Sequence, residues 1–218
     1  QDYANRVADM NIQRAAGAFR LLISAAIIFS IAWQVEDRVV NNVFRPGEYF
    51  AYFTIDSGMV AAVALAVAGA RALSGKRDTV LLNRVRLSVV SYEIVVAVVY
   101  NALLRGMPGD VRDGNYMWPQ TPNEILHVWA PILILLDFVI TTYGVKFKEI
   151  FWVLLFPLAW AAFSIVRGIA TGWWPYWFID PTDKGGVPQM VGYIIGIMVF
   201  MLVSASVALG LNKLVRRR

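Results

Sequence analysis

The sequence contains one histidine, His127, in the stretch TPNEILHVWAP at residues 121–131. An imidazole takes and gives a proton near neutral pH, so it can act as a general base toward a neighbouring hydroxyl. Thr54 offers such a hydroxyl, because both residues lie about four residues, or roughly 6 Å, inside the ends of predicted membrane helices. Deprotonated by His127, Thr54 would be a nucleophile for acyl transfer. The alternative is that both side chains only hydrogen-bond neighbouring helices.

Three further polar residues, Asn101, Arg167 and Gln34, lie within about one helical turn of the same predicted depth. Asn101 or Arg167 could hold an oxyanion or a lipid carboxylate. A guanidinium within a membrane segment is costly and is usually paired or directed into a cavity. Asp56 is the nearest candidate partner for Arg167, so a structural ion pair is the alternative to a substrate anchor. We therefore predict Arg167, Asn101 and Asp56 as substrate-binding or oxyanion residues.

Glu93 and Asp137 are acidic residues at greater predicted depth. They could relay protons, or they could be protonated or hydrogen-bonded within the bundle. The chain has no cysteine, and a single histidine without cysteine is a poor ligand set for zinc, an iron–sulfur cluster or haem. We expect neither a metal nor another cofactor.

These residues need membrane helices to position them. With 58% hydrophobic and 16% charged residues, the chain is more apolar than a soluble domain. Runs of about 20 apolar residues can cross a bilayer. We predict an all-α, polytopic membrane protein whose 218 residues form a single transmembrane domain, with six helices at 19–40, 49–73, 85–105, 123–143, 150–171 and 189–211.

Several local patterns refine this bundle. Small residues in the second half of the second helix, VAAVALAVAGA, favour a place in the middle of the bundle. Pro131 and Pro157 should kink the fourth and fifth helices, with neighbours satisfying the freed carbonyls. The run GWWPYWF is typical of an aromatic belt, and a lid over an outward-facing pocket is the alternative.

Basic residues lie beside the ends of the apolar runs, so the net charge of +5 indicates membrane orientation and not nucleic-acid binding. Cytoplasmic termini would place most lysines and arginines on the inner side, which the positive-inside rule favours. The polar lead with Arg6, Arg14 and Arg20 is expected on the membrane surface. We predict a multi-pass protein of the plasma membrane with both termini in the cytoplasm.

Three stretches resemble a known family: YFTIDSG at 52–58, NEILH at 123–127 with Pro131 four residues on, and WWPYWFIDP at 173–181. They are similar to the androgen-induced and ADTRP-like multipass membrane proteins and their six-helix bacterial relatives. Animal members are threonine hydrolases of fatty acid esters of hydroxy fatty acids. The resemblance implies Thr54 as nucleophile and His127 as base. Bacterial relatives commonly carry Gln-Ser-Asn where this chain has Asp56, Ser57 and Gly58.

The leading interpretation is a metal-independent lipid ester hydrolase that acts on a membrane lipid. The alternative is a non-catalytic accessory or lipid-binding subunit of a larger membrane complex. A transporter is a third interpretation, which the lack of an internal inverted repeat disfavours. A hydrolase needs a cavity that brings Thr54 Oγ1 and His127 within hydrogen-bond distance, whereas an accessory subunit does not.

Overall fold

The computed structural model describes residues 2–216, with side chains from Met10 onward, and this part of the chain is helical without a strand. Its α-helices are α1 (Asp2–Val40), α2 (Pro46–Tyr49), α3 (Phe53–Leu73), α4 (Val80–Val99), α5 (Gln120–Glu124), α6 (Ala130–Thr141), α7 (Leu155–Thr171) and α8 (Gly186–Arg216). Wider π-helical turns follow α4 at Tyr100–Leu104 and join α5 to α6 at Ile125–Trp129. Tighter 3₁₀ turns lie at Val111–Asp113, Phe147–Leu154 and Trp177–Ile179.

Six helical segments of the described chain are long and apolar enough to cross a membrane, which confirms the predicted number of spans. They cover Met10–Val40, Phe53–Leu73, Val80–Leu104, Gln120–Thr141, Phe147–Thr171 and Gly186–Arg216. The first helix begins far earlier than predicted, because the polar lead continues into it without a break. Arg20 is buried inside the bundle, so its predicted place on the membrane surface is wrong.

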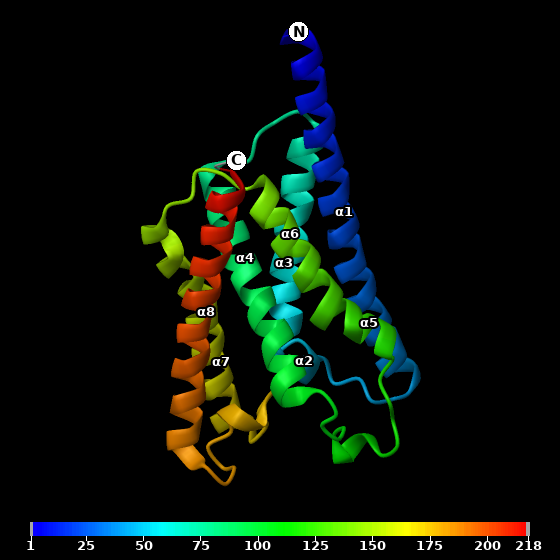
Figure 1. Ribbon diagram of the computed structural model, residues 1–218. Helices are drawn as coiled ribbons and strands as arrows, with labels where there is room; N and C mark the ends of the chain where they lie inside the picture. The colour runs from blue at the N-terminus through cyan, green and yellow to red at the C-terminus, as the bar shows by residue number, and fades with distance from the viewer. Residues whose placement is uncertain (1, 217–218) are drawn as a thin grey trace.

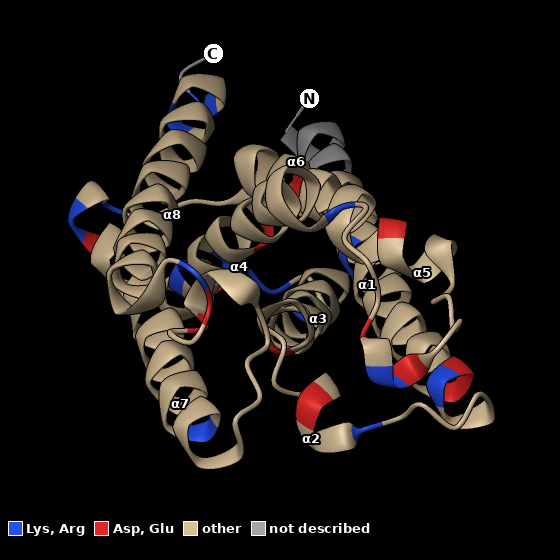
Figure 2. Ribbon diagram, turned by 90° about the horizontal axis from the view of Figure 1, so that it is seen from below, with Lys and Arg blue, Asp and Glu red and all other residues tan. Residues whose placement is uncertain are grey.

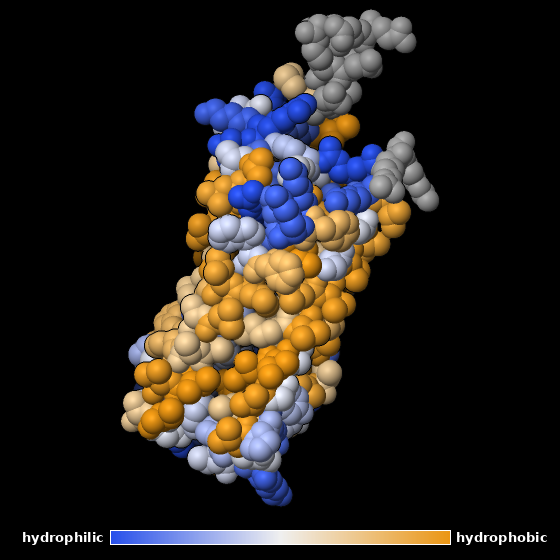
Figure 3. Space-filling view, turned by 90° about the vertical axis from the view of Figure 1, so that its left-hand side faces the viewer, coloured by the Kyte–Doolittle hydropathy of each residue, from blue (hydrophilic) through white to orange (hydrophobic). Residues whose placement is uncertain are grey.

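Both ends of the described chain lie at the same end of the bundle, which we call the terminal end (Figure 1). The connections 41–52, 105–119 and 172–185 lie at the opposite end, which we call the loop end (Figure 1). Helix α1 packs along α3, while α4 contacts α3, α6 and α8. The molecule shows a broad apolar band between two hydrophilic ends (Figure 3).

The small residues of α3 lie in the middle of the bundle, as predicted: Ala61, Ala64 and Ala68 are buried. Helices α1 and α3 meet most closely at Gly17 and Gly69. A Cβ added to either glycine would lie 2.9 Å from the backbone oxygen of the other. Glycine at both positions therefore allows the two backbones to touch, which is how membrane helices commonly pack.

At the loop end, charged residues at α2 pair with charged residues of the 105–119 connection. Arg112 Nη2 lies 2.7 Å from Glu48 Oε2, and Arg45 Nε lies 3.1 Å from the same oxygen. Asp110 also contacts Arg112, whose hydrogen bond lowers the pKa of that carboxyl to about 2. Figure 2, which views the molecule from the loop end, shows these acidic and basic segments side by side. The pairs fasten α2 to the connection between the third and fourth spans.

Candidate functional site

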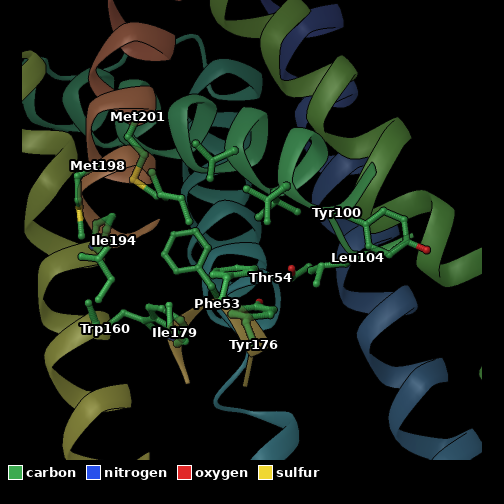
Figure 4. Close-up of a pocket in the computed structure, with 17 residues that line it drawn as sticks. Phe53, Thr54, Tyr100, Leu104, Trp160, Tyr176, Ile179, Ile194, Met198 and Met201 are labelled. Atoms are coloured by element: carbon green, nitrogen blue, oxygen red, sulfur yellow. The ribbon is translucent and has the colours of Figure 1, made fainter. Parts of the chain in front are cut away.

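An apolar pocket opens between α3, α4, α7, α8 and the 173–179 segment (Figure 4). Aliphatic, methionine and aromatic side chains line it, among them Val96, Leu104, Ile194 and Met201. Such a lining suits a hydrocarbon chain and offers few polar contacts.

Thr54 supplies a hydroxyl at the loop end of this apolar pocket. It is the second residue of α3, is half-buried, and lies beside Tyr176 (Figure 4). Burial raises the pKa of the Tyr176 hydroxyl, and hydrogen bonds with Thr54 offset part of that rise. The indole of Trp160, which also lines the pocket, is engaged elsewhere: its Nε1 donates to the Ala51 oxygen at 3.2 Å.

Aromatic residues cover the pocket at the loop end. The ring of Tyr52 lies 5.5 Å from Trp173 and 5.7 Å from Tyr176, measured between centroids. Tyr176 stacks on Phe178 at 5.1 Å, and both residues line the pocket. Tyr176 and Phe178 of the GWWPYWF run therefore line the loop end of the pocket near Thr54.

His127 lies in the π-helical turn before α6 and is buried. Its Nδ1 is 2.8 Å from the backbone oxygen of Asn123. A carbonyl only accepts, so Nδ1 carries the proton and Nε2 holds the lone pair that a general base needs. The imidazole stacks on Tyr100 with ring centroids 3.9 Å apart.

The structure does not bring Thr54 and His127 into direct contact: within residues 10–216, no hydrogen bond joins their side chains. Thr54 and Tyr100 line the apolar pocket. His127 instead lines a separate open groove between the third and fourth spans, here called the histidine groove, formed by Ala97, Val98, Asn101, Ala102, His127, Val128 and Ile132. Tyr100 is therefore a neighbour of both sites, because it lines the apolar pocket with Thr54 and stacks on His127.

Asn101 lies in the histidine groove, where its Nδ2 donates to the backbone oxygens of Ala97 at 2.8 Å and His127 at 3.4 Å. Pro131 has no N–H, so the His127 oxygen four residues earlier lacks its usual helical partner. The amide of Asn101 thus takes the place of that partner, as predicted for a proline inside a membrane helix.

Arg167 lies near the end of α7, with its guanidinium 4.4 Å from the centre of the Trp173 ring. Its Nη1 is buried and lacks a hydrogen-bond partner in the described part of the chain. Asp56 is half-buried and forms no ion pair with Arg167 among the described residues. Gln34 accepts a hydrogen bond from Tyr49 at 2.9 Å, on the side of α1. These residues lie at the loop end without converging on one point.

A cluster that the sequence reasoning missed lies deep in the terminal half. We call Arg20, Asp78, Arg86 and Asp137 the buried charge cluster, since each side chain is at most 4% exposed. Arg86 lies 2.6 Å from Asp137 and 2.9 Å from Asp78. Arg20 lies 2.9 Å from Asp137 and 3.2 Å from Asp78. Two positive and two negative groups cancel, which is how a bundle tolerates buried charge.

Thr141 completes this cluster by accepting from both guanidinium groups at 2.6 Å. Asp137 is thus engaged with two arginines, while Glu93 is buried with Ser57 Oγ at 3.4 Å. Asp137 and Glu93 therefore have different surroundings. The signal in the sequence was the pair of arginines: Arg20 and Arg86 lie inside apolar runs, and such positions demand acidic partners.

Comparisons with protein-family models, with curated proteins and with solved structures found no match, so the site is interpreted from this chain alone.

Proposed function

We propose that the protein binds the acyl chain of a membrane lipid in the apolar pocket and hydrolyses an ester held beside Thr54. The observation that carries this proposal is the position of Thr54, whose hydroxyl lies at the loop end of a pocket that is otherwise suited to hydrocarbon. A chain bound there would place a polar group at its end close to this hydroxyl.

In the proposed reaction His127 Nε2 takes the Thr54 proton while Oγ1 attacks the ester carbonyl. The Tyr176 hydroxyl is placed to donate to the oxyanion, since it already interacts with Thr54. Collapse of the tetrahedral intermediate breaks the C–O bond, and the leaving alkoxide takes the proton from His127. Water then cleaves the acyl-threonine and restores the free hydroxyl.

Two further residues have supporting roles in this proposal. Arg167 would bind an anionic group of the lipid, because its Nη1 lacks a partner among the described residues and its guanidinium lies beside Trp173 at the loop end. Asn101 would hold the backbone of His127, which it already contacts. We assign Asp56 no step, since it lies about 200° from Thr54 around the α3 axis.

We further propose that the protein resides in the plasma membrane with both termini in the cytoplasm. The basic residues support this orientation: exposed ones at the terminal end include Lys76, Arg77, Lys146 and Lys148. At the loop end Arg45 and Arg112 are paired with acidic residues, which reduces the positive charge there.

Labelling with a fluorophosphonate probe tests the hydrolase. We expect the purified chain to be labelled, and labelling to be lost in Thr54→Ala and His127→Ala while Thr54→Ser keeps it. Thr171→Ala is the matched control, because that hydroxyl donates to the Arg167 backbone and lies outside the pocket. Labelling that survives in Thr54→Ala, or an unlabelled parent chain, contradicts the hydrolase.

A non-catalytic lipid-binding subunit is the second candidate, and the placement of Thr54 and His127 in different pockets favours it. This candidate predicts an intact lipid that co-purifies with the unlabelled protein. Native mass spectrometry distinguishes the two, because a hydrolase incubated with a lipid ester accumulates a covalent acyl adduct or free acid and a binding subunit returns the ester unchanged.

A further inference from the structure

We propose that Tyr100 is a gate between the apolar pocket and His127, held shut by Asn123. Its role as a positioning residue in catalysis rests on the proposed function, but the gate itself can be measured without any activity.

Tyr100 contacts both the apolar pocket and His127. Its side chain lines the pocket together with Thr54, and its ring covers His127 at 3.9 Å with an angle of 26° between the planes. In Figure 4 the Tyr100 hydroxyl points away from Thr54 and out of the pocket. The ring thus covers one face of the imidazole while its edge lines the pocket that holds Thr54.

Asn123 holds both partners in place. Its side-chain Nδ2 donates to the Tyr100 hydroxyl, and its backbone oxygen accepts from His127 Nδ1 at 2.8 Å. The side-chain bond fixes the tyrosine, whereas the backbone bond fixes the histidine. Replacing the Asn123 side chain therefore releases Tyr100 and leaves the hydrogen bond of His127 intact.

A salt bridge supports the closed gate from the loop end. The Arg105 guanidinium lies 5.0 Å from the centre of the Tyr100 ring. Glu124 holds that guanidinium with two hydrogen bonds of 2.6 Å and 2.9 Å. Asn101 adds a third at 2.8 Å. The ring of Tyr100 is thus held between an imidazole and an anchored cation.

The backbone around the gate is irregular on both sides. Tyr100 begins one π-helical turn, closed by a bond of 2.7 Å from the Arg105 N–H to the Tyr100 oxygen, and His127 lies in the other. A π turn contains one extra residue, and such turns are frequent at functional sites. Moving that extra residue along the helix rotates a side chain by about 100°. This is a rotation that would carry Tyr100 off His127.

Chemical modification of histidine reports on one site in this chain, because His127 is its only histidine. Diethyl pyrocarbonate acylates a neutral imidazole, so its rate at one fixed pH reports access to His127 in protein purified without a histidine tag. The ether lipid 1-O-hexadecylglycerol, which cannot be hydrolysed as an ester, serves as the pocket-filling probe.

We expect slow modification of the parent chain that the ether lipid does not change. In Tyr100→Ala and Asn123→Ala modification should be at least about tenfold and about threefold faster, and the ether lipid should slow both. Met198→Ala is the control, since Met198 lines the same pocket from α8, outside the π-helical turn that contains Tyr100, and should leave the rate unchanged.

Rates for Tyr100→Ala and Asn123→Ala within twofold of the parent would overturn the gate, as would equal acceleration in Met198→Ala. If Tyr100→Ala unfolds, which a thermal stability measurement detects, Asn123→Ala alone still tests the gate. Loss of fluorophosphonate labelling in the parent would reject the hydrolase alone, because the modification rates do not depend on catalysis.

Discussion

The two residues best suited to catalysis in this protein, Thr54 and His127, have few hydrogen-bond partners. The Thr54 hydroxyl lies near the phenol of Tyr176 and is otherwise surrounded by apolar side chains. His127 Nε2 carries a lone pair, and the imidazole stacks on the ring of Tyr100. In the proposed reaction, Tyr100 has to move before the imidazole of His127 can reach the Thr54 hydroxyl. The charged residues in the terminal half are the reverse case, because their hydrogen bonds leave them little freedom.

Asp137→Asn should be the most damaging single substitution in the buried charge cluster. It leaves two buried arginines with Asp78 as their remaining acidic partner, and removing one member of a buried ion pair costs about 3–5 kcal/mol. Unfolding in mixed detergent micelles measures the loss. Arg86→Met/Asp137→Leu retains the Arg20–Asp78 pair and should be less destabilised than Asp137→Asn.

Glu124→Gln is the control for this prediction. It breaks the partly exposed pair with Arg105, whose side chain is 41% exposed, and such pairs contribute about 1 kcal/mol or less. Equal destabilisation by Glu124→Gln and Asp137→Asn would mean that burial does not determine the contribution of these pairs.

Among the helices, the contact between α1 and α3 leaves no room for a side chain larger than glycine. At Gly69 an added Cβ would lie 2.8 Å from Leu21 Cγ and 2.9 Å from the Gly17 oxygen. Neither helix can yield without separating from the other. The π-helical turns beside α4 and α6 differ from this contact. Their backbone hydrogen bonds are irregular, while the side chains of Tyr100 and His127 keep their contact.

Gly69→Ala should therefore lower the unfolding free energy by about 1–3 kcal/mol, the usual cost of overpacking. Thermal unfolding of the detergent-solubilised protein measures it. Gly210→Ala is the matched control in α8, because a Cβ there meets nothing within 4 Å and alanine favours a helix. A similar loss in both variants would show that the effect is not steric.

Hydropathy was sufficient to predict the six spans, because a run of apolar residues long enough to cross a membrane has few other uses. Predicted depth also grouped Thr54 and His127. Depth gives the height of a residue along its helix, but it does not give the direction in which the side chain points. That direction depends on packing, so the intervening Tyr100 was not predicted.

The buried charge cluster was missed for a related reason. Arg20 and Asp137 are 117 residues apart, and no local pattern connects them. Arg20 and Arg86 fit the positive-inside pattern, so the sequence alone did not reveal that they are buried and paired. The two π-helical turns also depend on tertiary contacts, since the hydrogen bonds of Asn101 and Asn123 that accompany them come from folding.

For the whole molecule, the clearest prediction concerns orientation. The chain has no cysteine, so Val111→Cys and Ser74→Cys each provide a unique label. Val111 is 93% exposed at the loop end, and Ser74 is exposed at the terminal end. A membrane-impermeant maleimide should label Val111→Cys in intact cells and Ser74→Cys only after permeabilisation. The reverse pattern would place the termini outside.

The buried charge cluster also imposes an order on synthesis. Arg20 enters the membrane in the first helix, long before Asp137 emerges from the ribosome in the fourth span. Asp78 follows the second span and is therefore the earliest acidic partner available to Arg20. Arg86 then arrives with one carboxylate already engaged, until Asp137 restores the balance. A nascent chain that stops before the fourth span therefore contains both arginines of the cluster and only one of the two carboxylates that balance them.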